Sequence, residues 1–277
     1  MESICEVLLY FFLFSFCGWV CETIFCSILE RKPVNRGFLS GPVCPVYGFG
    51  GLMVVYLLGP LQGNYSVLFL VGMVACTVLE YITSWILEKL FHAKWWDYSQ
   101  NHFNTNGRVC LTFSLIFGFL SIVAVELLYP PFTALMGWLP RVAKYWLAGG
   151  LLVIFALDLY ATIYTMLQLN GKLEEIRSGM EELRQRLEQV QVERIPLAQR
   201  LEELREDSSG KYDELKKQMK ERAQRLEKRI SRTQRFQYKR IMRAFPNFKS
   251  EKYQEQLERL KVMIERRVNK NEKKEEK

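Results

Sequence analysis

The first 170 residues alternate between long apolar runs and short polar connections. Five runs are evident, at about residues 7–29, 42–58, 67–90, 109–129 and 145–169. An α-helix needs about 20 apolar residues to cross a hydrocarbon core of roughly 30 Å, and these runs are close to that length. The pattern therefore predicts an all-α, polytopic membrane domain over residues 1–170 with five transmembrane helices.

Two stretches of this domain contain residues that disfavour a regular helix. The second run is interrupted by Pro45, Gly48, Gly50 and Gly51. We expect it to be irregular or closely packed, since small residues let backbones approach. Residues 130–144 are expected to form an interfacial loop. That stretch contains Pro130, Pro131, Trp138 and Pro140.

Beyond residue 170 the apolar spacing changes to a heptad repeat, which predicts a coiled-coil seam. One heptad position holds Leu173, Met180, Leu187 and Leu201, and the other holds Ile176, Leu183, Val190, Leu197 and Leu204. We expect a coiled-coil or helical domain over residues 171–268 and a disordered end over residues 269–277. A hairpin that folds back on the first tail helix and a parallel dimer both fit this seam. The dimer would make the protein a homo-oligomer.

Charge divides the chain at the same place. Residues 1–170 hold 8 Lys/Arg and 9 Asp/Glu, which leaves 30 and 21 of the totals of 38 and 30 for residues 171–277. Cytoplasmic loops carry the excess of Lys and Arg, and the loops after the first and third runs are the basic ones. With five crossings the N-terminus is expected outside and the tail in the cytoplasm. The seven cysteines predict no disulfide framework, because their number is odd and all lie in the apolar part.

Glu22, Glu80 and Asp158 are acidic residues well inside apolar runs, whereas Glu88 and Glu126 lie near the ends of theirs. A charged group at membrane depth is costly unless it is paired, hydrated or neutral, so the first three residues are candidates for a functional site. Glu22 and Glu80 also align in a short repeat, because residues 22–31 and 80–89 share the pattern E-x-I-x-x-x-I-L-E-[RK]. If the repeat is genuine, both carboxylates lie at matching depth and handle a proton or a cation, or hold a basic partner. Structural pairing or snorkelling to the interface is the alternative interpretation.

A second candidate region is the loop after the third run, together with one arginine of the first inner loop. Tryptophans here are typical of an interfacial belt, and the amides and arginines suit a phosphate headgroup. Histidine and aspartate in this loop match no zinc signature, so we expect no metal. The residues of this predicted inner-face site are Arg36, His92, Trp95, Trp96, Asp97, Asn106 and Arg108.

The tail contains a basic segment with interleaved aromatic residues. Beneath an anionic leaflet such a segment is expected to bind lipid. Nucleic-acid binding is not expected, since no RNP or similar motif accompanies the charge. A solvated helical face is the simpler alternative. The basic residues of this segment are Arg235, Lys239, Arg240 and Arg243.

Several longer motifs resemble one family. These are Gly18-Trp19, Glu22, ERK-VNRGFL-GP (30–42), CP-YGFG (44–50), LEYITSW-LEKLFHAKWWDYS (79–99) and FN-NGR-C (103–110). Over about residues 5–170 they resemble the CmpB-like ABC-transporter type IV permeases. The resemblance implies a multi-pass bacterial plasma-membrane protein labelled as a permease, without an established substrate.

Three functions are compatible with these features. The first is a permease-like transport subunit, for which a separate ATPase must dock, because the chain has no G-x-x-x-x-G-K-[ST] loop. The second is a scaffold that recruits cytoplasmic proteins through its tail. The third and least favoured is a lipid enzyme using His92, Asp97 and His102. We expect no enzymatic activity and no cofactor.

Overall fold

The structure is a computed structural model of the whole chain. It describes residues 3–31, 33–192, 217, 238, 240–242, 244–245, 248–250, 253–255 and 257–258. The chain forms two compact units. The first comprises Met1–Met166 and Arg240–Lys252, and the second comprises Leu167–Lys239 and Tyr253–Lys277. By this partition residues 240–252 belong to the first unit, whereas the predicted domains placed them in the tail. The domain boundaries stay a prediction.

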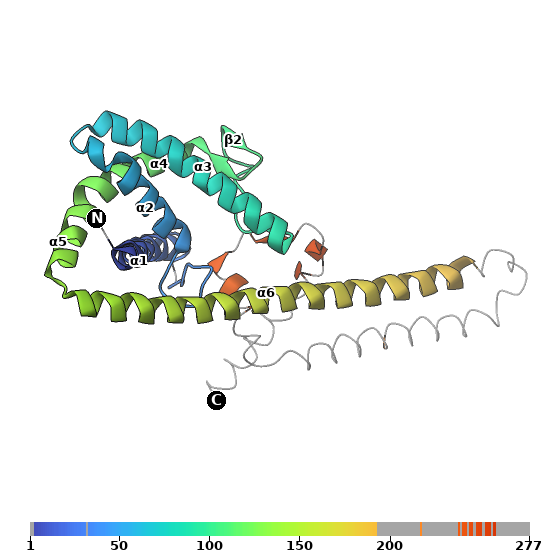
Figure 1. Cartoon of the computed structure of the whole chain (residues 1–277). Coiled ribbons are helices and arrows are strands. Elements are labelled where there is room, and N and C mark those ends of the chain that lie inside the picture. Colours follow the sequence, from blue (N-terminus) through green and yellow to red (C-terminus); the bar gives the residue numbers. More distant parts are fainter. Residues whose placement is uncertain are drawn as a thin grey trace, which may run out of the picture. The chain divides into compact units, whose positions relative to one another are not determined.

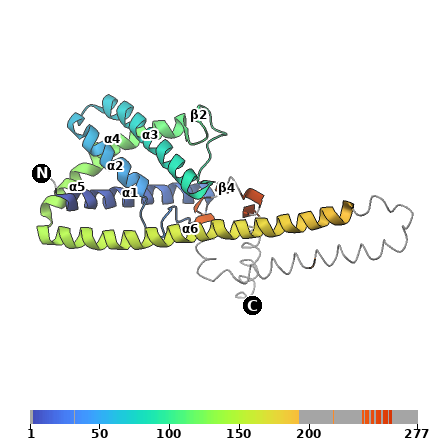
Figure 2. The same cartoon turned by 45° about the vertical axis from the view of Figure 1, so that its right-hand side comes forward.

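Helices dominate the described residues (Figure 1). The helical elements are α1 (Ile4–Glu30), α2 (Pro45–Leu58), the 3-10 turn η1 (Gly59–Leu61), α3 (Tyr65–Phe91), α4 (Leu111–Ile122), the π-helical turn η2 (Val123–Leu128), α5 (Tyr129–Trp138) and α6 (Arg141–Val192). In the first unit α2 packs against both α1 and α3, and α3 packs against α4 (Figures 1 and 2). The fold is therefore mostly helical, as predicted.

Four short strands accompany these helices. Strand β1 (Ala93–Lys94) pairs antiparallel with β4 (Lys249–Ser250), and β2 (Asn104–Thr105) pairs antiparallel with β3 (Val109–Cys110). The second pair is a hairpin within the loop that joins α3 to α4. The first pair holds residues 249–250 of the C-terminal segment against the chain just after α3.

Local sequence signals set the ends of the two longest helices within the first 110 residues. Ser3 and Glu6 form a capping box at the start of α1. Asn64 accepts a hydrogen bond from the backbone amide of Val67 at the start of α3. Both helices end at a residue in the left-handed conformation, Arg31 with φ 52° and His92 with φ 49°. Such C-terminal caps satisfy carbonyls that the last turn leaves without partners.

Gly48 and Gly51 of α2 face α1 at very short range, which is the close packing expected here, whereas Gly50 faces Leu79 of α3. A Cβ atom built on Gly48 would lie 2.2 Å from Ser15 Oγ, and one on Gly51 would lie 2.4 Å from Phe14 Cγ. The backbones approach to a distance that only glycine permits at these positions. The backbone amide of Cys44 also donates to Ser15 O at 3.0 Å, so α2 begins beside the middle of α1.

The predicted interfacial loop over residues 130–144 is largely wrong. Helix α5 runs through Pro130 and Pro131 to Trp138, and only Leu139 and Pro140 separate it from α6. The two prolines occupy the first turn of α5, directly after the π-helical turn η2. A first-turn amide has no partner within its helix, so proline is tolerated there.

Four described helical stretches are long and apolar enough to cross a membrane. They are Ile4–Leu29, Tyr65–Phe91, Leu111–Trp138 and Arg141–Glu175. The second predicted span forms the shorter apolar helix Pro45–Leu61. At 1.5 Å per residue, α2 alone is about 21 Å long, less than a typical hydrocarbon core of about 30 Å. A fifth crossing stays a prediction.

The apolar core of the first unit lies where α1, α2, η2 and α5 meet the start of α6. It is built from buried side chains, among them Leu9, Tyr10, Phe14, Val54, Val55, Leu58, Leu68, Val125, Met136 and Ala148. At the start of α6, Lys144 Nζ lies 2.5 Å from Glu6 Oε1 near the start of α1. Apolar packing and the ion pair between Glu6 and Lys144 thus hold this end of the bundle together.

In the second unit, α6 continues past Met166 to Val192. Leu173, the first predicted seam residue, is buried with 1% of its surface exposed. The Tyr253 hydroxyl donates to the Glu174 carboxylate, and Leu257 is also buried. The predicted seam beyond residue 192 and the end over residues 269–277 lie outside the described residues. The coiled coil and the homo-oligomer stay predictions.

Candidate functional site

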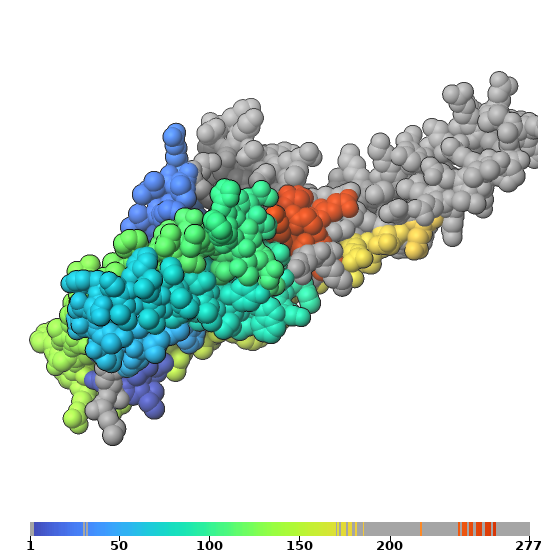
Figure 3. Space-filling view, turned by 90° about the horizontal axis from the view of Figure 1, so that it is seen from above, coloured from blue at the N-terminus to red at the C-terminus, as the bar shows by residue number. Residues whose placement is uncertain are grey.

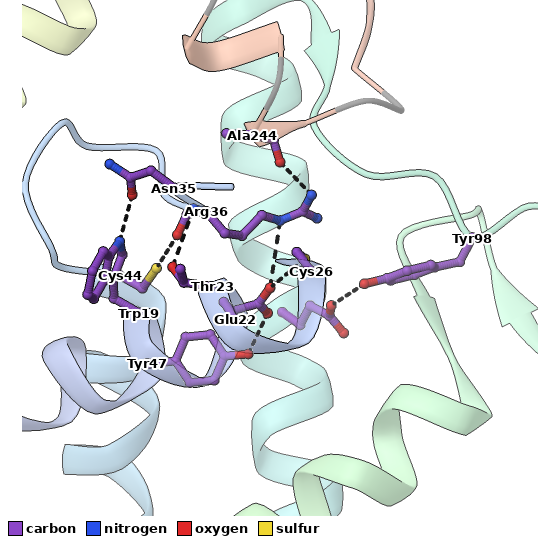
Figure 4. Close-up of polar contacts among 11 residues, drawn as sticks. Trp19, Glu22, Thr23, Cys26, Asn35, Arg36, Cys44, Tyr47, Tyr98 and Ala244 are labelled. Carbon is purple, nitrogen blue, oxygen red and sulfur yellow. Dashed lines mark hydrogen bonds and ion pairs between the residues drawn. The ribbon is translucent and has the colours of Figure 1, made fainter. Parts of the chain in front are cut away.

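Glu22, on α1, lies in a cluster of polar side chains (Figure 4). The Tyr47 hydroxyl of α2 donates to Glu22 Oε1 at 2.6 Å, and Arg36 Nε lies 3.6 Å from Glu22 Oε2. The thiol of Cys26, one turn further along α1, lies 3.9 Å from Oε2. Tyr47 reaches the carboxylate because its ring packs on Gly18, where a Cβ atom would lie only 2.2 Å from it.

Glu80, on α3, is the more buried of the two acids, with 9% of its surface exposed. The Tyr98 hydroxyl donates to its Oε1 at 3.4 Å. Its other oxygen, Oε2, is buried and has no hydrogen-bond partner among the described residues. Figure 4 shows Tyr98 directed toward the cluster that contains Glu22, so the two acids contribute to one group of polar side chains. A buried carboxylate oxygen without a partner is costly, because it has lost its water and gained no donor.

The α1–α2 loop (residues 33–44) is fixed to α1 by side chains of that helix. The indole of Trp19 donates to Asn35 Oδ1 at 2.7 Å. The backbone amide of Arg36 donates to Thr23 Oγ1 at 3.4 Å. These contacts place the Arg36 side chain beside Glu22, and Arg36 also donates to the carbonyl of Ala244 (Figure 4). Arg36 therefore connects an acid of α1 with the C-terminal segment (residues 240–252).

Asp158, the third predicted acid, holds the backbone of this same loop. Its Oδ1 accepts from the amide of Ser40 at 3.1 Å, and its Oδ2 accepts from the amide of Gly41 at 2.7 Å. The hydroxyl of Thr162, one turn along α6, lies 3.4 Å from Oδ1. Asp158 therefore binds the α1–α2 loop, and its hydrogen bonds with the described residues do not reach the Glu22–Glu80 cluster.

Arg240 holds the carbonyl side of the same loop. Its Nη1 donates to Gly37 O at 3.2 Å and to Leu39 O at 2.5 Å, and its Nη2 donates to Phe38 O at 3.0 Å. Burial lowers the pKa of Arg240, and the carboxylate of Asp158 opposes that shift. The prediction placed Arg240 at a lipid surface, but it lies against backbone carbonyls. Arg235, Lys239 and Arg243 lie outside the described residues.

The α3–α4 loop (residues 92–110) has its own charge pair. Arg108 donates through Nε and Nη2 to Glu88 Oε2, at 3.0 and 2.9 Å, and through Nη1 to the Tyr81 hydroxyl at 3.1 Å. Asn106 also donates to that hydroxyl, at 3.2 Å. The two predicted arginines thus pair with different acids. Arg36 lies beside Glu22, whereas Arg108 binds Glu88 near the end of α3.

Trp95 is not a belt residue. Only 3% of its surface is exposed, and its ring makes edge contacts with Phe38, Phe245 and Phe248, with centroids 4.9 to 5.2 Å apart. The C-terminal segment provides two of these rings, and they exclude Trp95 from headgroups. The neighbouring Trp96 donates its indole N–H to Arg108 O at 3.0 Å.

Asp97 joins the α3–α4 loop to the C-terminal segment. Its Oδ2 lies 2.6 Å from Lys249 Nζ, and its Oδ1 accepts from the amide of Ser99 at 3.0 Å. The ammonium of Lys249 and the hydroxyl of Ser99 hold the pKa of Asp97 well below its usual range. The space-filling view shows the orange-red C-terminal residues beside the green loop (Figure 3).

The two histidines do not join this network. His92 forms the exposed cap of α3, and His102 is exposed in the α3–α4 loop. Among the described residues, no group of three or more His, Cys, Asp or Glu side chains could hold a metal ion. Sequence reasoning missed Tyr47, Tyr98 and the amides of residues 40–41. Both tyrosines stand in the quoted motifs CP-YGFG and WWDYS, which was the available signal.

Comparison with known proteins identifies a family. A family model with the description "Putative ABC-transporter type IV" matches residues 9–163, which contain Glu22, Glu80, Asp158 and both loops. No curated protein matches the chain. No solved structure matches it either.

Proposed function

Because the chain belongs to the ABC-transporter type IV family, we propose that it is a permease-like subunit of a membrane transport system. In this proposal the bundle is multi-pass, its N-terminus lies outside, and the tail lies in the cytoplasm. The site formed by Glu22, Glu80, Tyr47 and Tyr98 takes up a proton or a cation from the cytoplasmic side. Energy comes from a separate ATPase, since the sequence has no phosphate-binding loop of its own.

The observation that carries this proposal is the buried oxygen of Glu80. Glu80 Oε2 has no partner among the described residues, and a second carboxylate, that of Glu22, lies in the same group of polar side chains. Two acids that share a buried site cannot both ionise at low cost, so such a pair retains a proton or binds a cation. Intramembrane acids in this arrangement are typical of ion and proton pathways.

The position of the site along the helices fits uptake from one side. Glu22 lies eight residues before the last residue of α1, and Glu80 lies eleven residues before the last residue of α3. These separations correspond to about 12 Å and about 16 Å of helix. Both acids thus lie in the predicted cytoplasmic half of the bundle, close to its cytoplasmic end.

The test is proton uptake by proteoliposomes that contain the full-length protein. An imposed potential drives protons inward, and an internal pH dye records the flux. We expect Glu80→Gln to abolish the flux, because the amide keeps the shape but carries no titratable proton. Glu126→Gln is the matched control. Glu126 accepts from the backbone amide of Gly63 at 2.7 Å at the opposite ends of the helices and should leave the flux unchanged. Equal flux in wild type and Glu80→Gln would remove Glu80 from the mechanism.

A scaffold remains the second candidate, favoured by the length of α6. This helix has 52 residues, of which the candidate span takes Arg141–Glu175, so it continues without a break beyond the bilayer. Co-purification from native membranes separates the two functions. An ATPase retained in detergent supports the transport subunit, whereas a different fixed partner supports the scaffold. Truncation of the tail is not a clean test, because residues 240–252 belong to the first unit.

A further inference from the structure

Three consecutive backbone carbonyls of the α1–α2 loop converge on one positive charge. Gly37 O, Phe38 O and Leu39 O all accept hydrogen bonds from the guanidinium of Arg240, at 2.5 to 3.2 Å. In an extended chain successive carbonyls point in alternating directions, so their convergence defines a concave group of oxygen acceptors. Gly37 and Leu39 are buried, and Phe38 between them is partly buried, so this part of the loop lies against the rest of the unit.

A negative charge lies behind these carbonyls. The next two amides along the loop, those of Ser40 and Gly41, donate to the carboxylate of Asp158. That carboxylate also interacts electrostatically with Arg240. Three aligned carbonyl dipoles backed by one carboxylate make a site for a cation that has several N–H donors. Irregular backbone inside membrane proteins serves the same purpose where its carbonyls coordinate cations.

The cation that fills this group comes from a distant part of the chain. Arg240 is 201 residues from Leu39, and described residues of its segment, among them Ile241, Ala244 and Phe248, are buried. The contacts of this segment include a pair of two-residue strands, the rings of Phe245 and Phe248 on Trp95, and an ion pair of Asp97 with Lys249, whose side chain is 56% exposed. Arg36 adds a hydrogen bond to the carbonyl of Ala244 and lies over the ring of Phe245. The loop that carries the three carbonyls is also held by Trp19, Thr23 and Asp158, none of which belongs to this segment. The place of the acceptors therefore does not depend on Arg240 alone.

We propose that the carbonyls of Gly37, Phe38 and Leu39, backed by Asp158, form a binding site for a guanidinium-bearing organic cation, which Arg240 occupies as an internal substitute. The fork of a guanidinium matches the three acceptors through two nitrogens, whereas a cation without N–H groups cannot satisfy them. Undocking of residues 240–252 would open the site to a free ligand. The inference rests on the proposed function in that it names a ligand class for the transport system.

Binding of methylguanidine by the full-length protein in nanodiscs tests this site. A tethered side chain competes at an effective concentration of the order of millimolar, so its removal should tighten binding strongly. We expect Arg240→Ala to bind methylguanidine saturably and at least tenfold more tightly than wild type. Tetramethylammonium, which has the charge but no N–H donor, should not bind. Failure of a folded Arg240→Ala protein to bind methylguanidine would overturn the proposal.

Two further measurements keep the test decisive if Arg240→Ala does not fold. Lys249→Met weakens the docking of the segment without touching the carbonyls, so it should tighten methylguanidine binding severalfold with Arg240 still present. In wild type, millimolar methylguanidine should also increase hydrogen exchange at Lys249 and Ser250, because it displaces Arg240. Unchanged binding in Lys249→Met together with unchanged exchange would show that Arg240 is a fixed structural contact, and the proposal would fail.

The outcome is separable from the test of the transport function. Methylguanidine binding needs neither an ATPase nor flux, and the acceptors are backbone atoms of the α1–α2 loop. Glu80→Gln should therefore lose proton flux and keep methylguanidine binding. Loss of flux with no binding in any variant rejects the ligand site alone, and binding with normal flux in Glu80→Gln rejects the Glu80 mechanism alone.

Discussion

The carboxylate of Asp158 on α6 accepts a hydrogen bond of 2.7 Å from the backbone amide of Gly41. The same carboxylate accepts a hydrogen bond from the preceding backbone amide, that of Ser40. One side chain thus satisfies two successive backbone donors of an irregular loop. Backbone amides away from water need partners, and a loop between apolar helices cannot find them in a neighbouring strand or helix. Asp158, an acid in a predicted span, thus supplies the hydrogen-bond acceptors that these loop amides do not find in the backbone.

Replacement of Asp158 by Asn should destabilise the first unit. The amide group keeps one acceptor oxygen but places an N–H donor against a backbone N–H donor, which leaves one partly buried amide without a partner. We expect a loss of about 1–3 kcal/mol in the free energy of unfolding. Thermal unfolding in nanodiscs measures it. Thr165→Ala is the control, because that hydroxyl donates to the carbonyl of Ala161 within its own helix. Equal stability of the two variants would contradict the assignment.

Gly48→Ala should disrupt the contact between α1 and α2. The added Cβ would lie 2.2 Å from Ser15 Oγ and 2.6 Å from the ring of Phe11. Overpacking of this kind typically costs about 1–3 kcal/mol. Chemical or thermal unfolding of the purified protein checks the loss. Gly149→Ala on α6 serves as its control, since a Cβ there meets nothing within 4 Å. Alanine also suits a helix better than glycine, so a destabilising control would count against the explanation.

The ion pair of Asp97 with Lys249 should persist to acidic pH. The pKa of Asp97 is depressed in the folded protein. The ion pair therefore contributes to stability above the unfolded pKa of about 3.9, and this contribution is lost only as the pH falls below that value. The carboxyl carbon of Asp97, followed by NMR between pH 7 and pH 3, should show no inflection. In Lys249→Met an inflection should return toward pH 4, because the largest cause of the shift is gone.

The effect of Lys249→Met on global stability should be small. The Lys249 side chain is 56% exposed, and ion pairs in contact with solvent contribute about 0–1 kcal/mol. A larger loss at pH 7, or an Asp97 titration that is identical in both proteins, would show that the depressed pKa has another origin.

Arg108→Lys should weaken the closure of the α3–α4 loop. Three nitrogens of Arg108 donate to Glu88 and Tyr81, and a lysine ammonium on a flexible stem cannot reproduce that fork. We expect a loss of about 1–2 kcal/mol, in line with hydrogen bonds to charged groups. Unfolding measurements compare this loss of stability with that of Arg31→Lys, a control substitution at the exposed C-terminal cap of α1. A loss no greater than that of the control would mean that the fork is not needed.

The helices of the membrane domain were largely predictable, because the length of an apolar run and the caps at its ends are local properties. The predicted runs 7–29 and 67–90 became Ile4–Glu30 and Tyr65–Phe91. The loop prediction failed at Pro130 and Pro131 because proline disfavours the interior of a helix but not its first turn, and the sequence alone did not locate that turn.

The sequence by itself determined the apolar runs and the places of Glu22, Glu80 and Asp158 within them, since hydropathy and the cost of buried charge depend on residue type alone. Only the tertiary structure decided the partners: Arg36 and Tyr47 for Glu22, loop amides for Asp158, and loop carbonyls for Arg240. Periodicity records which residues avoid water, but it does not record which distant segment covers them. The contact between Arg240 and Leu39 spans 201 residues, and only chain closure brings the two together.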